Sequence, residues 1–160
     1  MYFPDSLVMV PLQDLLCHAV HALPPEISPI MSSIAASDRL PLFETRTDYV
    51  VFEKILAGAH ANSGIRIAAY CLMPNHWHLL LWPKRDGELS DVLRWMTVTH
   101  TQRWHAHHQT AGTGPVYQGR FKSFPVQTDE HFLTVTRYLE RNALRAKLVK
   151  QAENWQWSSL

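Results

Sequence analysis

Charged side chains are scarce in this chain: Asp, Glu, Lys and Arg make up 18% of its 160 residues, below the quarter that soluble domains usually carry. Cysteine is rarer still, with only Cys17 and Cys71, too few for a disulfide framework or a four-cysteine zinc site. No apolar run approaches the roughly 18 residues of a membrane span, and Met1–Val10 lacks the positive start of a secretory signal. We therefore expect a protein of the reducing cytoplasm with no membrane partner.

Apolar material is nevertheless plentiful. Hydrophobic residues make up 46% of the chain and aromatic residues 11%, which suffices to bury a core. The length fits one domain better than two.

The net charge of +1 hides a gradient along the chain. Residues 1–40 hold four acidic side chains and one basic, whereas residues 94–150 hold nine basic and three acidic. Aromatic residues such as Trp104, Phe121 and Phe124 lie among these basic residues. This combination suits a phosphate backbone with bases to stack on, and it equally suits a solvated surface over core aromatics.

Hydrophobic periodicity and turn residues divide the chain at about residue 40. Residues 1–40 are rich in Pro, Ser and Ala, and offer only a short helix over Leu12–Leu23. The rest predicts a helix over Asp48–Asn62 capped by Thr45 or Thr47, strands over Ile65–Met73 and Trp77–Trp82, a helix from Ser90 to about Trp104, a strand over Val116–Val126, and a helix from Thr128 to about Ala143. This order predicts an α+β fold, an antiparallel sheet with helices packed on it. We also expect the tail around Trp155–Trp157 to pack back onto the body.

His76-Trp77-His78 opens the second of the two adjacent strands. Because strand side chains alternate between faces, the two imidazoles point the same way and Trp77 points into the other layer. Such a pair is a bidentate metal grip, or else it caps the edge of a core.

Tyr138 and Asn142 lie four residues apart on the last helix, hence on one face, at the margin of its apolar stripe. The tyrosine is a nucleophile or a packing residue. Arg137, Arg141 and Arg145 repeat at the same spacing in a neighbouring row, which would place guanidinium groups beside the tyrosine.

The two motifs explain each other. A metal held by two histidines and an amide oxygen would polarise a phosphodiester, and a neighbouring tyrosine would attack it. A further group of histidines, His100, His105, His107 and His108, scatters around the faces of one predicted helix. We interpret that group as a polar or nucleic-acid-facing surface.

Several ordered motifs resemble the single-tyrosine HUH transposases, and among them the REP-associated tyrosine transposases. The matching segments run from about Leu40 to the C-terminus: Ala69–Leu81, Tyr117–Lys122, Tyr138–Asn142 and Trp155–Ser159. The resemblance implies a ferredoxin-like antiparallel sheet flanked by helices, in a transposase domain over residues 41–160.

The resemblance also implies an activity and a set of residues. Members of this family cleave and rejoin single-stranded DNA beside palindromes that fold into hairpins. By this resemblance His76, His78 and Asn142 bind Mg²⁺ or Mn²⁺, and Tyr138 attacks the scissile phosphate to leave a 5′-phosphotyrosine and a free 3′-OH. The expected partner is single-stranded or hairpin DNA, bound by a monomer or a homodimer. The residues expected to contact DNA are Tyr117, Gln118, Arg120, Lys122, Arg137, Arg141 and Arg145.

Residues 1–40 depart from the family. Its members usually open with a central strand bearing a Tyr-His-Val-x-Asn-Arg-like motif, and residues 1–40 contain none. If Pro29–Ala36 were encoded CCT ATC ATG TCC TCA ATC GCG GCG, a frame starting at the last T of the proline codon would read Tyr-His-Val-Leu-Asn-Arg. Our hypothesis is that this N-terminal segment is frameshifted. The chain then either folds poorly or fills the gap with residues 1–40 in another way.

Three functions follow for testing. The first is a DNA strand transferase of the single-tyrosine type, the second a decayed or domesticated relative that binds hairpin DNA without cutting it. The third is a small metal-dependent hydrolase built on His76 and His78.

Overall fold

The computed structural model describes residues 28–37, 41–127 and 130–160. Its elements in chain order are β1 (Ile30–Ala35), α2 (Arg46–Ser63), β2 (Arg66–Met73), β3 (His76–Trp82), α3 (Glu88–His108), β4 (Lys122–Pro125), α4 (Glu130–Glu140), α5 (Asn142–Arg145) and a 3₁₀ turn, η2 (Ala152–Asn154).

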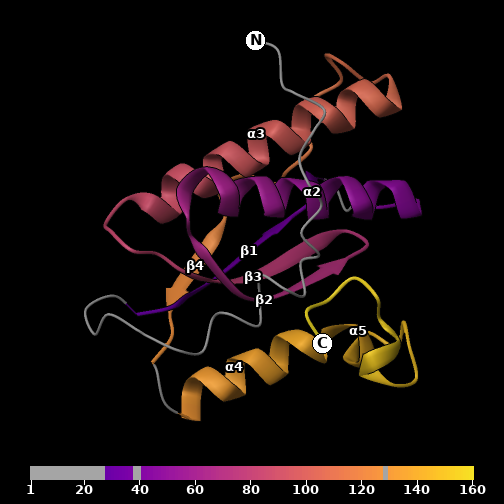
Figure 1. Cartoon of the computed structure of the whole chain (residues 1–160). Coiled ribbons are helices and arrows are strands. Elements are labelled where there is room, and N and C mark those ends of the chain that lie inside the picture. Colours follow the sequence, from indigo (N-terminus) through magenta and orange to yellow (C-terminus); the bar gives the residue numbers. More distant parts are fainter. Residues whose placement is uncertain (1–27, 38–40, 128–129) are drawn as a thin grey trace.

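The four strands form one antiparallel sheet in the order β2-β3-β1-β4. With a helix after β1 and another after β3, this is the βαββαβ arrangement of a ferredoxin-like fold, and the expected fold class is confirmed. Figure 1 shows α2 and α3 covering one face of the sheet, and α4 with α5 lying against the other. No helix in the described part of the chain is long and apolar enough to cross a membrane.

The segment Ile30–Ala35 supplies the strand that the family motif would have occupied. This β1 pairs with β3 on one side and β4 on the other, so it is central in the sheet. Met31 and Ile34 are buried on opposite sides of it. Of the two possibilities that the sequence left open, a missing strand and a replaced strand, the structure therefore shows the replaced strand. A β-ladder is made by backbone groups, so a different sequence with enough apolar residues can take the position.

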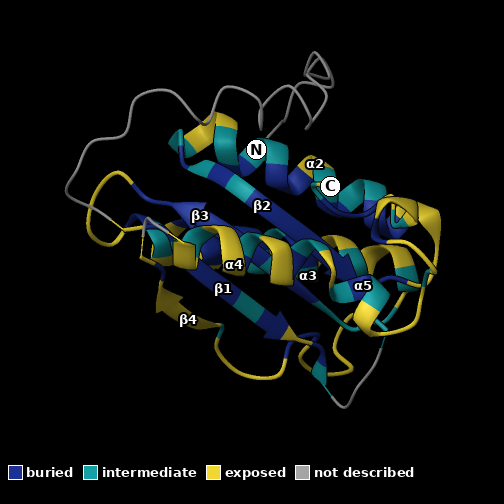
Figure 2. Cartoon of the chain, turned by 90° about the horizontal axis from the view of Figure 1, so that it is seen from below, coloured by how far each residue is buried: buried dark blue, intermediate teal, exposed yellow. Residues whose placement is uncertain are grey.

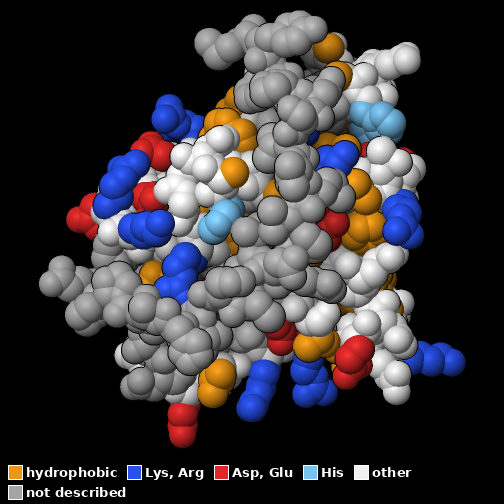
Figure 3. All heavy atoms as spheres, in the orientation of Figure 1, with side chains coloured by type: hydrophobic (Ala, Val, Ile, Leu, Met, Phe, Trp, Pro, Cys, Tyr) orange, Lys and Arg blue, Asp and Glu red, His pale blue; other side chains and the backbone are white. Residues whose placement is uncertain are grey.

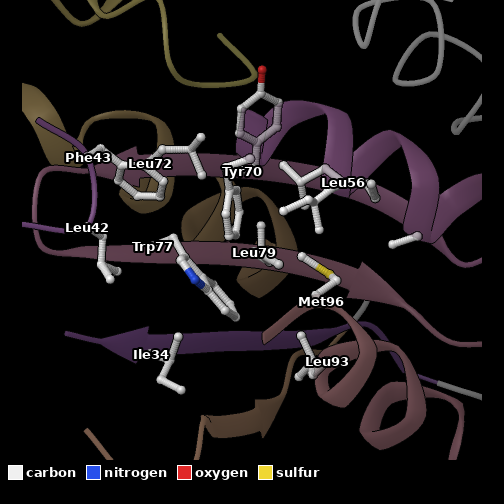
Figure 4. Packing of buried hydrophobic residues seen from close by; sticks show 14 of the residues in the cluster. Ile34, Leu42, Phe43, Leu56, Tyr70, Leu72, Trp77, Leu79, Leu93 and Met96 are labelled. Carbon is white, nitrogen blue, oxygen red and sulfur yellow. The ribbon is translucent and has the colours of Figure 1, made fainter. Parts of the chain in front are cut away.

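The two faces of the sheet carry different cores. Trp77, Leu79 and Leu81 of β3 point into the larger cluster, with residues of α2 and α3 such as Phe52 and Met96. Figure 4 shows these side chains closing the space between sheet and helices. On the other face, a smaller cluster joins Leu80 and the alternate residues of β2 to α4 and α5. Viewed from below in Figure 2, β2 and β3 are mostly buried while the edge strand β4 is exposed.

Helix α2 is capped by Thr45, one of the two threonines that the sequence offers, and it begins two residues before the predicted Asp48 and ends one residue after the predicted Asn62. The Thr45 hydroxyl accepts a hydrogen bond from the Asp48 backbone N–H while the Asp48 carboxylate accepts one from the Thr45 N–H, a reciprocal capping box. Gly64 ends the helix with φ at 71°, a conformation that favours glycine. Between these ends, Gly58 lets α3 approach closely, because a Cβ there would stand 3.1 Å from the Trp95 ring.

The start of one predicted helix and both ends of one predicted strand differ in the structure. Helix α3 starts at Glu88 after Gly87, so Ser90 lies inside the helix and is not its cap. The Glu88 carboxylate accepts a hydrogen bond from the Lys84 backbone N–H, which folds the preceding turn onto the helix start. The predicted strand over Val116–Val126 shortens to β4, with an isolated bridge between Ala36 and Tyr117 before it.

The last helix is interrupted rather than continuous. It divides into α4 and α5 at Arg141, although i→i−4 hydrogen bonds from Arg141 to Arg137 and from Arg145 to Arg141 carry the helical turn across the junction. The predicted cap Thr128 lies outside the described residues, as does the predicted helix over Leu12–Leu23.

The C-terminal tail packs back as expected, along the outer edge of β2. The Leu72 N–H donates to the Trp157 carbonyl, the Trp155 indole donates to the Leu72 carbonyl at 3.0 Å, and the Ser159 N–H donates to the Tyr70 carbonyl. Trp157 also stacks on Tyr49 with ring centroids 4.6 Å apart. The tail thus satisfies backbone groups that an open sheet edge would leave unpaired.

Candidate functional site

His76 and His78 lie on one face of the central strand β3, and the ring of Tyr138 from α4 faces them. The two imidazole centroids are 4.9 Å apart, and the His78 and Tyr138 centroids are 6.4 Å apart. Trp77 between the histidines is fully buried in the core of the opposite face. The strand alternation predicted from the sequence is confirmed, and the sheet brings the histidine pair to the tyrosine.

Both imidazoles are neutral at physiological pH. Burial lowers the pKa of His76, and burial together with the neighbouring His76 lowers the pKa of His78 to about 4. A metal-binding imidazole must be neutral. The ring nitrogens fit a metal ion as well: Nδ1 of His76 lies 2.7 Å from the Asn75 side-chain oxygen, and Nδ1 of His78 is buried with no hydrogen-bond partner among the described residues. The pair can therefore hold a divalent ion, and the orphaned nitrogen is the atom that one would satisfy.

Tyr138 and Asn142 occupy successive turns across the α4–α5 junction. Tyr138 is 42% exposed, so its hydroxyl can be reached from solvent, whereas Val135 and Leu139 of the same helix are buried. Asn142 is half-buried at the start of α5. Its side chain makes no hydrogen bond to either histidine within the described residues.

Arg145 confirms the expectation that a guanidinium lies beside the tyrosine. Its guanidinium carbon stands 4.7 Å from the centroid of the Tyr138 ring, within the range of a cation–π contact. Arg137 and Arg141 are exposed on the same helical stretch. A cleft of about 390 Å³ opens beside His76, lined by Pro41, Met73, Pro74, Asn75, Ala146 and Leu148 as well.

The segment expected to contact DNA divides into buried and exposed residues. Tyr117 is buried: its hydroxyl accepts a hydrogen bond from the Trp77 indole at 3.2 Å and lies in hydrogen-bond contact with Nδ1 of His100. A ring held in this way packs the core and cannot stack on a base, which corrects its expected DNA contact. Gln118, Arg120 and Lys122 are exposed and remain able to reach a ligand.

On the face shown in Figure 3, Lys and Arg side chains appear at several separate places, with Asp and Glu among them. The visible surface that is not grey therefore carries no continuous basic patch.

A second cluster joins two helices and was not expected from the sequence. The Nε2 atoms of His107 and His108, at the end of α3, lie 4.0 and 3.7 Å from Oδ1 of Asp48, near the start of α2. Ligand atoms of the three residues lie within 4.8 Å of one another. The interpretation of the α3 histidines as a polar or nucleic-acid-facing surface is wrong for His100, which is buried, and it did not foresee that His107 and His108 would lie beside Asp48. Only the helix packing places them beside Asp48, and no spacing in the sequence signals it.

The sheet order and the His76–His78–Tyr138 arrangement define a ferredoxin-like protein with a histidine pair and a tyrosine at one face of its sheet. The chain belongs to the family of IS200-like transposases, whose family model matches residues 33–142. That match starts inside β1 and ends at Asn142, so it includes every residue of this arrangement. None of the curated proteins is similar enough in sequence to be matched with this chain.

Solved structures share the fold at low sequence identity. A REP-associated tyrosine transposase bound to a REP hairpin superposes with a TM-score of 0.69 at 16% identity, over 87% of this chain and 82% of that one. A protein from Deinococcus radiodurans, assigned as a transposase, superposes with a TM-score of 0.52 at 15% identity, over 75% of this chain and 95% of that one. The expected family is confirmed, and these similarities support the fold.

Proposed function

We propose that the protein is a single-tyrosine transposase that cleaves and rejoins single-stranded DNA beside hairpins through a 5′-phosphotyrosine. The observation that supports this most directly is the contact between the ring of Tyr138 and that of the half-buried His78, whose centroids are 6.4 Å apart. The nucleophile and the metal ligands of such a reaction must share one phosphate, and these residues come from separate elements to one place.

The reaction assigns each residue a step. The Tyr138 hydroxyl loses its proton and its oxygen bonds to the scissile phosphorus, while the bond from phosphorus to the 3′ oxygen breaks and that oxygen takes up a proton. Mg²⁺ or Mn²⁺ held by His76 and His78, with Asn142 as third ligand, would supply positive charge at the phosphate. Arg145 keeps the tyrosine ring in place through its cation–π contact. Rejoining is the reverse transfer to a 3′-OH, which needs no added energy source because one phosphodiester replaces another.

The exposed basic residues would hold the DNA. Arg120, Lys122, Arg137 and Arg141 contact phosphates in this proposal, and Gln118 completes the set. The fold neighbour bound to a REP hairpin makes a DNA hairpin the first ligand to test. Binding that weakens steeply with salt would follow from phosphate contacts, for a monomer or a homodimer alike.

We also propose that residues 41–160 carry the chemistry, with β1 completing their sheet. All the catalytic and metal-binding residues proposed lie in that range. Ile30–Ala35 pairs with β3 at the histidines themselves, with Ser33 opposite His78 and Ala35 opposite His76 on the neighbouring strand. The replaced strand therefore supports the very segment that holds the site. Whether it derives from a frameshift is a question for the gene sequence.

The test is covalent capture on a denaturing gel. Single-stranded DNA with hairpins from the gene's neighbourhood, labelled at its 3′ end, is incubated with Mn²⁺, with Mg²⁺ or with EDTA. Wild type should carry the label with a metal ion only, and Tyr138→Phe and His76→Ala should carry none. Tyr138→Phe keeps the ring and loses only an exposed hydroxyl, so it should stay folded and still bind the hairpin.

Other outcomes would replace the proposal. Hairpin binding without any adduct from folded wild type would favour a DNA-binding relative that no longer cleaves. An adduct that persists in Tyr138→Phe would assign the nucleophile elsewhere. Metal-dependent cleavage without an adduct in either protein would indicate the hydrolase alternative.

A further inference from the structure

We propose that Asp48, His107 and His108 form a second metal site, which binds a divalent transition-metal ion of the Zn²⁺ class and joins α2 to α3. This proposal is independent of the transposase activity. The site lies on the two helices that cover the face of the sheet opposite α4, and none of its residues belongs to the arrangement around Tyr138.

The Asp48 carboxylate has one oxygen engaged and one free. Its Oδ2 accepts hydrogen bonds from the Glu44 N–H, the Thr45 N–H and the Thr45 hydroxyl at 2.8 to 3.0 Å. These bonds lower the pKa of Asp48 against the opposing effect of burial, so the group is ionised. The side chain is only 6% exposed, and its Oδ1 is the atom that faces His107 and His108. A mostly buried carboxylate is stabilised by a cation placed at the oxygen that its hydrogen bonds do not use.

The histidine side of the cluster is also unsatisfied. Nε2 of His108 is buried and has no hydrogen-bond partner in the described part of the chain, and its ring is stacked on Trp104 with centroids 4.3 Å apart. The stacking fixes the direction in which Nε2 points. His107 is more exposed and leaves the cluster open to solvent on one side, which provides room for a water ligand.

The separations indicate an ion between the ligands rather than direct pairing. At 3.7 and 4.0 Å from Oδ1, both nitrogens stand beyond the roughly 2.9 Å of a hydrogen bond. Two ligands of a tetrahedral Zn²⁺ stand about 3.3 Å apart, given bonds of about 2.0 Å, so small side-chain adjustments would close the site. Two imidazoles and one carboxylate suit Zn²⁺ or a similar ion, whereas Mg²⁺ prefers oxygen ligands.

Helix packing adds an electrostatic reason for a cation here. His107 and His108 are the last residues of α3, where carbonyl groups give the helix end a partial negative charge. The ion would lock the end of α3 to the capping box that starts α2. Since α2 and α3 together cover the larger core, a bound ion should stabilise the fold.

The test separates this site from the histidine pair on β3. A His76→Ala/His78→Ala variant, which lacks that pair, is compared with the same protein carrying His107→Gln and His108→Gln in addition. Equilibrium dialysis with Zn²⁺ counts the bound ions, and Co²⁺ in place of Zn²⁺ gives visible absorption bands that report its ligands. The matched control is the His76→Ala/His78→Ala variant with His105→Gln added instead of the His107 and His108 changes. His105 lies in the same last turn of α3 but outside the cluster.

We expect the double variant to bind one Zn²⁺ and to gain in melting temperature with it, the control to do the same, and the fourfold variant to show neither. If the His76 and His78 changes impair folding, wild type is compared with His107→Gln/His108→Gln instead. These two proteins should differ by one bound Zn²⁺. Equal Zn²⁺ binding with and without His107 and His108, or no Zn²⁺ binding by the double variant, would overturn the proposal.

Discussion

His78 and Tyr138 meet across the boundary between the sheet and α4, with ring centroids 6.4 Å apart and their planes at 77°. His78 is held by the most central part of the fold, since β3 pairs with both β1 and β2. Tyr138 stands on a helix anchored by the buried Val135 and Leu139. The histidine is thus fixed by the sheet, whereas the tyrosine that contacts it is partly exposed.

Arg145 should influence the reactivity of Tyr138 more than its affinity for DNA. Replacing it by Gln removes the guanidinium 4.7 Å from the ring centroid. We expect adduct formation at saturating DNA to slow by about tenfold, because the negative charge on the reacting phosphate in the transition state loses a nearby positive charge. Lys150→Gln is the control: it removes the same charge from an exposed residue. Equal slowing in both variants would show that the total charge of the protein, and not the position of Arg145 beside Tyr138, determines the rate.

Ser32 offers a stabilising substitution in the replaced strand. It is fully buried in the central strand β1, and its hydroxyl has no hydrogen-bond partner in the part of the chain that the structure describes. Ser32→Val removes that unsatisfied group and adds a β-branched side chain, so the free energy of unfolding should rise by about 1–2 kcal/mol. Urea denaturation measures it, and Ser123→Val on the exposed β4 should change little. A decrease for Ser32→Val would mean that the site has no room for the extra methyl group.

The same position bears on the frameshift hypothesis. The alternative frame begins in the Pro29 codon, so its third codon, read as valine, ends within the codon of Ser32. The hypothesis therefore places an apolar residue where the present chain buries an orphaned hydroxyl. The nucleotide sequence decides: codons at 29–36 that do not allow Tyr-His-Val-Leu-Asn-Arg would eliminate the hypothesis.

His100 should make the fold sensitive to acid. The indole of Trp77 donates to the Tyr117 hydroxyl, which also lies in hydrogen-bond contact with Nδ1 of the buried His100. Burial lowers the pKa of His100 to about 4, below that of an unfolded histidine near 6.5. The unfolded state therefore binds the proton first, and stability should fall as the pH drops from about 6.5 to about 4.

Denaturation in urea with EDTA across this pH range would measure the effect. His100→Gln keeps an acceptor for Tyr117 without a titrating group, so its stability should fall less steeply than that of wild type. Parallel curves for the two proteins would assign the acid sensitivity to other groups.

The tail along β2 should contribute measurably to stability. Trp155→Phe removes the indole N–H that bonds the Leu72 carbonyl and leaves that acceptor unpaired, so we expect a loss of about 1–3 kcal/mol. Trp104→Phe is a matched control, because its buried indole nitrogen has no hydrogen-bond partner among the described residues. Similar losses in both would indicate that lost ring contacts, and not the hydrogen bond, account for the effect.

The sequence alone was sufficient for the local features of the chain. The Thr45 cap, the Gly64 end of α2, the hairpin around Pro74 and the opposite orientation of His76 and Trp77 all follow from short-range rules of capping, turn formation and strand alternation. The order of strands and helices then predicted an α+β fold, and the spacing of Tyr138 and Asn142 placed both residues on one side of a helical stretch.

Tertiary structure decided what depends on contacts between distant segments. Residues 1–40 predicted no strand, yet Ile30–Ala35 forms one between β3 and β4, because backbone hydrogen bonds do not depend on side-chain identity. Tyr117 looked like a base-stacking residue until the packing of Trp77 and His100 enclosed it. Asp48 met His107 and His108 only because α2 packs on α3. Local rules fix which elements form and which way their side chains point, whereas the packing of those elements determines which side chains meet.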